Sequence, residues 1–548
     1  MRIRATVIHA TLIFCCLSLF IFGLWASHLF AQEAEEHHRH GSDEKLGTVI
    51  FPTSCSPDAQ KSFEHAVALM HSFQYTASEK DFKDVAASDK NCAMAHWGEA
   101  MALYHQLWDK PKANILKEGH QDLEQALKIK ARTERETDFI KAALLFYNTN
   151  KKLDHDTRTH RYSDAMGKMY EKYPDDTEVA GFYALSLLTW DPPDDKNYAN
   201  RRKAIAVLNK LYAANPDHPG AAHYLIHSAD RPELAPLALD AARRYAEIAP
   251  GSSHAIHMPS HIFSRLGLWQ ESIASNSAAA TAANREILAR QAEAHYEFHP
   301  MDYLQYAYLQ IGREKDAWQV TENLDTVPDA DPETLAEVKA FFTARYYLEL
   351  HDWAHAAALP VPAILKPRDR IDTYWAQTIG AARLGDAATA SKAFENYKSV
   401  DDGNGVYRSP KPGEVSVERQ EATAWNDYAA GKKDDAVRQM RAAADQEDAD
   451  APETALMPAR EMLADMFLEM NRAPDALVEY EKNLKESPNR FDGLYGAARA
   501  AELAGKPQQA TSYYSQLLKN CDGGAYSNRP ELAHAKTLLA TNNPGQAP

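Results

Sequence analysis

From Pro57 onwards, apolar residues recur every three or four positions in stretches of roughly 12–18 residues, separated by short polar or glycine-containing turns. An apolar stripe at this spacing is typical of amphipathic helices that bury one face. No stretch alternates apolar and polar residues in the way that a half-buried strand would. The pattern therefore predicts an all-α protein built from short helical hairpins.

The predicted hairpins repeat with a period of about 34 residues, as the spacing of Ala204, Ala238 and Ser272 shows. A glycine stands five positions before the small residue of several hairpins, as Gly267 does before Ser272. The small residue lets the second helix approach the first, and the glycine closes the turn between them. This helix–turn–helix period resembles the tetratricopeptide repeat, which implies a right-handed solenoid with a concave groove.

The N-terminus has a different pattern, because two arginines and the apolar stretch TLIFCCLSLFIFGLWA precede a small residue at Ala31. We expect an export signal peptide at 1–31, with an uncleaved inner-membrane anchor as the alternative. A charged linker is expected at 32–56. The interruption VPDADP then divides two lobes, an N-terminal solenoid at 57–328 and C-terminal repeats at 329–540. No later apolar run is long enough to span a membrane, so the protein is expected to be periplasmic or secreted.

Charge and cysteine content narrow the expected partners and the compartment. The chain has 60 Lys plus Arg against 77 Asp plus Glu, a net charge of −17, which repels phosphate backbones. We therefore expect no nucleic-acid partner. Beyond the signal peptide, three cysteines remain. In an oxidising compartment Cys55 and Cys92 could pair, and two separately buried thiols are the alternative.

Histidines gather on one predicted face of three consecutive repeats. If the small residue of the second helix is position 20, then positions 2, 5 and 9 of the first helix face the groove in the repeat that this chain resembles. The polar and aromatic residues at these positions in the three repeats are His223 and His227, then His254, His257 and His261, then His299, Asp302 and Tyr306. His71 and His105 are also separated by one full period, and both fall at position 13.

The six histidines and Asp302 on neighbouring first helices predict a metal site. Adjacent helices pack about 8–10 Å apart, so imidazoles from two neighbours can reach one ion. Zinc and copper favour imidazole, and a carboxylate would add an oxygen ligand or orient a histidine. We expect His257 and His261 to bind one ion together with His223 or His227. The alternative is a set of neutral polar residues in a ligand-binding groove, which His71, His105, Asp230 and Tyr306 are also expected to line.

Pro259 interrupts the helix that carries three of these histidines, in HAIHMPSHIFSRLG. In the repeat register it lies in the middle of the helix, where it removes a hydrogen bond at a cost of about 3 kcal/mol. A kink there would change the direction in which the neighbouring histidine side chains point. Alternatively, Pro259 opens a helix that starts late, and His254 and His257 lie in the preceding loop.

The blocks HPGAAHYLIHSAD and HAIHMPSHIFSRLGLW resemble those of a family of exported bacterial tetratricopeptide proteins, over about residues 46–325. This resemblance supports the site without naming a reaction. Two functions are therefore predicted. The first is a cell-envelope binding or scaffold protein that holds a peptide or protein partner in its groove and zinc or copper at its histidines. The second is a metal-dependent enzyme, hydrolytic or redox, and a closed pocket over the histidines would favour it.

Overall fold

The structure is a computed structural model that describes residues 45–107, 110–189, 195, 197–401, 403, 414–450 and 457–542. These residues form α-helices and short 3-10 turns, and no strand occurs among them. The all-α repeat architecture that the sequence predicts is thus confirmed. The predicted signal peptide at 1–31 and most of the linker at 32–56 lie outside the described residues. None of the described helices combines the length and apolar character that crossing a bilayer requires.

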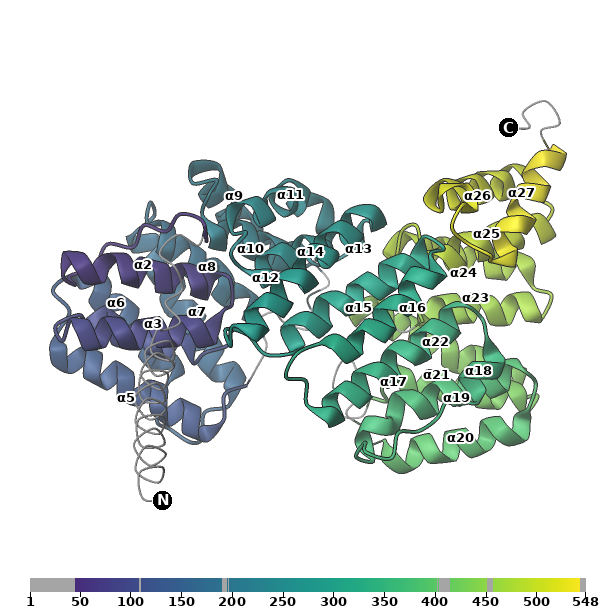
Figure 1. Ribbon diagram of the computed structural model, residues 1–548, viewed down its shortest axis with the longest axis horizontal. Helices are drawn as coiled ribbons and strands as arrows, with labels where there is room; N and C mark the ends of the chain where they lie inside the picture. Colours follow the sequence, from purple (N-terminus) through teal and green to yellow (C-terminus); the bar gives the residue numbers. More distant parts are fainter. Residues whose placement is uncertain are drawn as a thin grey trace, which may run out of the picture. The chain divides into compact units, whose positions relative to one another are not determined.

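The helices follow one another as antiparallel pairs (Figure 1). The N-terminal helices are α2 (Pro57–His71), α3 (Tyr75–Ser88), α4 (Ala93–Ala102), α5 (Ala113–Ile129), α6 (Glu134–Phe146), α7 (His155–Lys172), α8 (Thr177–Thr189) and α9 (Ala199–Ala214). The histidine-rich part comprises α10 (Pro219–Ala229), η1 (Ala235–Ala238), α11 (Leu239–Ile248), α12 (Ser253–His257), α13 (Pro259–Arg265), α14 (Trp269–Leu288), α15 (His295–Gln310), α16 (Glu314–Asn323) and η2 (Leu324–Thr326).

The remaining helices continue the same pairing towards the C-terminus. They are α17 (Pro332–Glu349), α18 (Trp353–Ala357), η3 (Arg368–Arg370), α19 (Ile371–Arg383), α20 (Ala387–Val400), α21 (Val417–Ala429), α22 (Lys433–Asp450), α23 (Ala459–Glu469), α24 (Ala473–Glu486), α25 (Phe491–Leu503), α26 (Pro507–Asn520), η4 (Asp522–Gly524) and α27 (Pro530–Asn542).

The hairpin that carries the densest histidine block is closed at Gly267, as the sequence predicts. Gly267 lies between α13 and α14 with a φ of +64°, a conformation that costs glycine little and other residues more. Ser272, five residues later, is fully buried and lets α14 pack against α12 and α13. A Cβ atom on Gly267 would lie 2.3 Å from the Pro488 carbonyl oxygen, so this turn also packs closely on the C-terminal repeats.

Three large apolar clusters form the core of the described residues. The first runs from Phe51 to Phe263, the second from Trp269 to Phe342, and the third from Ala344 to Ala535. The second cluster includes residues on both sides of the loop at 327–331, where the sequence places a lobe boundary. The described end of the predicted linker, from residue 45, also lies against the helices, because the Thr48 amide donates to the Asp217 carbonyl.

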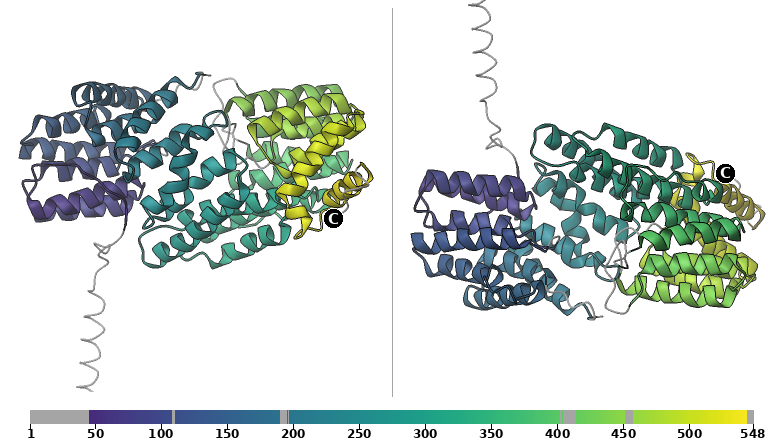
Figure 2. Two further views of the ribbon diagram at one scale, coloured as in Figure 1. Left: turned by 90° about the horizontal axis from the view of Figure 1, so that it is seen from above. Right: turned by 90° about the horizontal axis from the view of Figure 1, so that it is seen from below.

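Two long-range connections hold the N-terminal helices together. A disulfide joins Cys55 to Cys92, with the two Cα atoms 4.5 Å apart, which confirms the predicted pairing. Helix α2 packs against α10 although the two are far apart in the sequence, and Figure 2 shows the purple N-terminal helices beside the teal ones. This packing brings the turn between α2 and α3 onto the histidine-rich helices.

Candidate metal centre

The histidines of the predicted site come from three neighbouring first helices of the repeats (Figure 1). Helix α10 carries His223 and His227, and α15 carries His299. Between them, the chain is helical over α12 and α13, with only Met258 separating the two. Pro259 occupies the first position of α13, as the alternative in which Pro259 opens a helix predicts. However, His254 and His257 are helical residues of α12 and do not lie in a loop.

The first histidine triad consists of His223, His227 and His254, each of which offers a ring nitrogen within 4.8 Å of the other two. The Nδ1 atom of His223 lies 2.6 Å from the His71 carbonyl oxygen, which can only accept a hydrogen bond. The proton of His223 is therefore on Nδ1, and its Nε2 lone pair faces His254 Nε2 at 3.2 Å. His227 Nε2 is buried and has no hydrogen-bond partner among the residues that the structure describes.

The second histidine triad consists of His257, His261 and His299, again with ligand atoms within 4.8 Å of one another. His257 Nδ1 lies 2.7 Å from Asn276 Oδ1. The orientation of the Asn276 amide is fixed, because its Nδ2 donates to the Ser272 carbonyl oxygen at 2.9 Å. The Asn276 oxygen must then accept from His257, which places the proton of a neutral His257 on Nδ1.

His261 has the same arrangement, with a carboxylate in place of the amide. Its Nδ1 lies 3.0 Å from Asp230 Oδ2, while Arg265 donates to the other Asp230 oxygen at 2.7 Å. The Asp230 pKa lies well below its usual value in spite of burial, because Arg265 and His261 stabilise the ionised form. An ionised carboxylate only accepts, so His261 also carries a proton on Nδ1.

The two Nε2 atoms that remain, those of His257 and His261, face each other at 3.0 Å. With both Nδ1 atoms protonated, two lone pairs would oppose each other unless a cation lies between them. A proton can be shared by these two nitrogens, whereas a metal ion can bind these two and His299 together. Zinc–nitrogen bonds of about 2.0–2.1 Å at a tetrahedral angle place ligand nitrogens about 3.3 Å apart, close to the one short separation in each triad, 3.0 Å for His257 and His261 and 3.2 Å for His223 and His254.

The electrostatic environment keeps most of these rings neutral. Burial lowers the pKa of His223 to about 3. Burial, followed by neighbouring imidazoles, lowers the pKa values of His227, His254 and His257 well below 6.5. The neutral ring is the form that binds a metal ion, so protons compete weakly for these nitrogens at neutral pH.

A cavity of about 600 Å³ borders both triads. Five of the six histidines line it, all except His223, which lies deeper. The opposite wall is formed by α17 and α19 and includes Val338, Phe341 and Asp372. A volume of this size fits a small organic ligand beside the histidines.

The other predicted site residues are distributed unevenly. Asp302 lines the cavity, but its carboxylate forms an ion pair with Arg345 and is not part of either triad. Tyr306 is buried away from the triads, where its hydroxyl accepts a hydrogen bond from Arg490 at 3.0 Å. His105 stacks on Tyr75, with ring centroids 4.6 Å apart. Asp230 touches the site through His261.

His71 belongs to a separate buried network behind the first triad. Its Nε2 lies 2.8 Å from Glu178, and Glu178 also lies 3.1 Å from His218 Nε2. The two histidines stabilise ionised Glu178, whose pKa is lowered in spite of complete burial. The other ring nitrogen of His71 lies 2.8 Å from the Tyr224 hydroxyl, and the His71 backbone oxygen accepts the hydrogen bond from His223.

The sequence interpretation missed Asn276, which orients His257 from the second helix of the hairpin. Asn276 is fully buried and lies four residues after Ser272, on the face of α14 that packs on α12 and α13. An amide among the small residues of SIASNSAAATAA was the available indication, because a buried amide requires polar partners.

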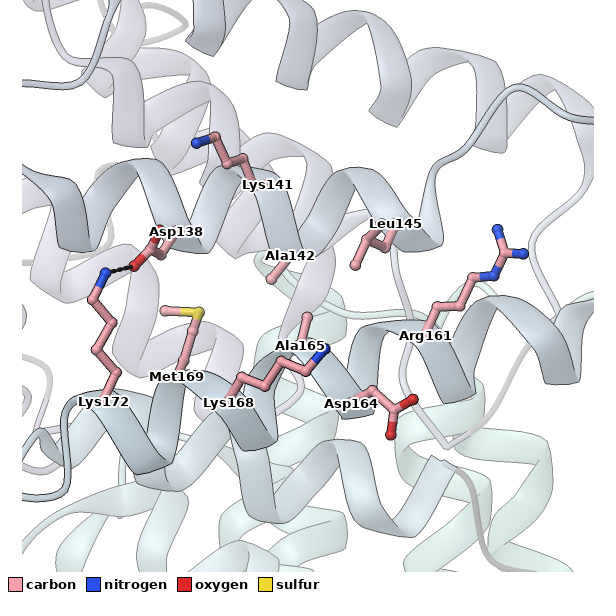
Figure 3. A pocket seen from close by; sticks show the side chains of 10 residues that line it. All are labelled: Asp138, Lys141, Ala142, Leu145, Arg161, Asp164, Ala165, Lys168, Met169 and Lys172. Atoms are coloured by element: carbon pink, nitrogen blue, oxygen red, sulfur yellow. Dashed lines mark hydrogen bonds and ion pairs between the residues drawn. The ribbon is translucent and has the colours of Figure 1, made fainter.

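A second hollow, of about 540 Å³, lies between α6 and α7 and holds none of the predicted site residues (Figure 3). Its basic side chains include Lys141, Arg161 and Lys168, while Lys172 pairs with Asp138 and Glu134. These groups lie at the surface and do not converge on one point (Figure 3).

No protein-family model matches the chain, and neither does any curated protein. Among solved structures, a tetratricopeptide repeat protein from Parabacteroides merdae is 15% identical. The match covers 52% of this chain and 98% of that protein, with a TM-score of 0.28. Human IFIT1, as a dimer with m7Gppp-AAAA, is 12% identical over 82% of this chain and 94% of its own, with a TM-score of 0.35. At these values the comparisons carry no inference about function.

Proposed function

We propose that this helical-repeat protein binds a divalent transition metal ion, zinc or copper, at His257, His261 and His299. The observation that carries the proposal is the approach of two Nε2 lone pairs to 3.0 Å while both Nδ1 atoms are engaged elsewhere. Asn276 and Asp230 act as the outer partners that fix ring orientation and increase ligand basicity in metal sites. The lowered pKa of His257 favours the neutral imidazole, which is the form that binds a metal ion.

Elemental analysis of protein purified without an affinity tag tests this function. After chelation and dialysis against zinc or copper, the wild type should retain at least one ion per chain. The double variant His257→Ala/His261→Ala should lose the ion of this triad. The matched control is His355→Ala, because His355 is an exposed histidine on α18 that pairs with Asp352.

Two results would contradict the proposal. Wild-type protein that retains well under one ion per chain would show that the histidines are polar cavity residues. A double variant that binds as much metal as the wild type would place the ion elsewhere. The histidines His37, His38 and His40, which lie outside the described residues, would then be examined.

We also propose that the protein acts in the cell envelope, as a periplasmic or secreted protein. The N-terminal pattern at 1–31 supports export, and so does the Cys55–Cys92 disulfide, because disulfides persist in oxidising compartments. Cell fractionation and N-terminal sequencing test this proposal. A mature chain that starts after Ala31 supports a cleaved signal peptide, a membrane-bound chain with its first residues intact supports the anchor, and a cytoplasmic chain contradicts export.

Two further roles remain as candidates for the solenoid. The repeat architecture supports a scaffold that binds a peptide or protein partner. The cavity beside the histidines specifically favours a metal-dependent enzyme, because a ligand inside it would lie next to the ion. Metal-loaded wild-type protein assayed with ester, amide and phenol substrates should then be active, whereas the double variant and the chelated wild type should not. Equal activity in these three protein samples would exclude the metal-dependent reaction.

A further inference from the structure

The two histidine triads are built on the same plan, displaced by one repeat. In each, two histidines four residues apart come from the first-helix segment of one repeat, α10 in the first triad and α12 with α13 in the second, and the third comes from the first-helix segment that follows. His223, His227 and His254 form the first triad, and His257, His261 and His299 form the second. The two pairs are separated by one full repeat period. The two sets of histidines thus occupy equivalent positions in successive repeats.

The rings of the two triads are as close to each other as rings within one triad. Within the triads, ring centroids are separated by 4.4 Å, for His257 and His299, up to 6.5 Å, for His227 and His254. Between the triads, His254 and His257 are 6.2 Å apart, and so are His227 and His261. Ions held by the two triads would therefore be near neighbours in one site.

Both triads also border the same cavity, through His227 and His254 on one side and His257, His261 and His299 on the other. Three protein nitrogens leave each ion with an open coordination position. Neither triad contains a carboxylate. Among the described residues that line the cavity, the charged groups are the carboxylates of Asp302, Glu337 and Asp372, which belong to neither triad, and there is no lysine or arginine. Two divalent ions held by neutral imidazoles would carry a large positive charge, which favours a small anion as a shared ligand.

We propose that the two triads form one dinuclear metal centre whose ions share a bridging oxygen-donor anion inside the cavity. This inference rests on the proposed metal-binding function and extends it from one ion to a coupled pair. The simplest bridge is hydroxide, formed when metal-bound water releases one proton to the solvent. The ligand class that this centre recognises is therefore a small oxygen-donor anion able to bind both ions, and azide serves as a spectroscopic probe of the same open positions.

A copper(II) titration of chelated, tag-free protein, followed by electron paramagnetic resonance, tests the pair. At two equivalents, we expect both ions to bind and the double-integrated intensity per copper to fall at least twofold, with a half-field transition. Added azide should change the optical spectrum of the two-copper form. The variant His299→Ala should bind one copper with undiminished intensity. The control His355→Ala, at an exposed histidine of α18 that does not line the cavity, should behave as the wild type.

The possible outcomes separate this inference from the proposed function. Two bound coppers with full, uncoupled intensity, or a single bound copper, would overturn the dinuclear centre and leave the metal-binding function standing. Absence of copper binding would overturn both. If His299→Ala retains a coupled pair of coppers, His299 is not a ligand of the second ion, and the inference is also overturned.

Discussion

Replacing Asn276 by leucine tests whether the second triad binds a metal ion through a His257 ring that Asn276 holds in place. Asn276 is fully buried, and its Oδ1 accepts the His257 Nδ1 proton at 2.7 Å. Leucine has a similar branched shape but cannot accept this bond. Loss of an outer partner of a metal-binding histidine lowers affinity about 10–100-fold, or about 1.4–2.7 kcal/mol. The unpaired, buried His257 donor should also lower the free energy of unfolding by about 1–3 kcal/mol.

The assay is calorimetric titration of zinc into chelated protein, with urea unfolding of the metal-free form measured in parallel. The control is Asn284→Leu, because Asn284 lies on the same helix and its Nδ2 donates to Glu297 outside both triads. In a His257→Ala background, Asn276→Leu should not change zinc affinity further. If folded Asn276→Leu binds zinc within twofold of the wild type, then Asn276 is only a packing residue and the orientation argument fails.

Three further predictions concern the fold. Burial raises the pKa of Asp372 to about 7. The native state thus binds this proton more tightly than the unfolded chain, and stability present at about pH 4 is lost as pH rises through 7. Asp372→Asn should raise the free energy of unfolding by about 1–2 kcal/mol at about pH 8 and have little effect at about pH 4, in urea titrations. Gly267→Ala should destabilise by about 1–3 kcal/mol more than Gly505→Ala, since both glycines have positive φ but only Gly267 meets a carbonyl oxygen. Denatured, unreduced protein cleaved after Ala31 should show one free thiol, that of Cys521, by thiol titration, and a count of three in the cleaved chain would contradict the disulfide.

The repeat register predicts most of the local structure. A constant repeat period is enough to place Gly267 in a turn and Ser272 in a helix–helix contact, because both properties depend on neighbours within one hairpin. The register also places the histidines on one face. The register also places a turn between α17 and α18, where Asp352 caps the helix that carries His355.

The grouping of the ligands depends on contacts that the register does not contain. It suggests His257 and His261 together with His223 or His227, whereas the structure adds His299 to the former pair and His254 to the latter. His254 and His257 both lie on α12 but belong to different triads, while His257 and His261 share a triad across the break at Met258. Tyr306 fits the repeat pattern, yet Arg490, which is 184 residues away in the sequence, binds its hydroxyl.

The two triads differ in their surroundings, although the repeat makes their ligand sets alike. Phe73, in the turn between α2 and α3, lies against all three rings of the first triad, with centroid distances of 4.4–5.8 Å. The second triad instead opens to the cavity through all three of its histidines. An ion in the first triad would exchange its fourth ligand less readily, because an apolar ring covers part of its surroundings. The N-terminal helices thus make the two histidine sets unequal, and in the proposed dinuclear centre the ion of the second triad is the one expected to exchange ligands.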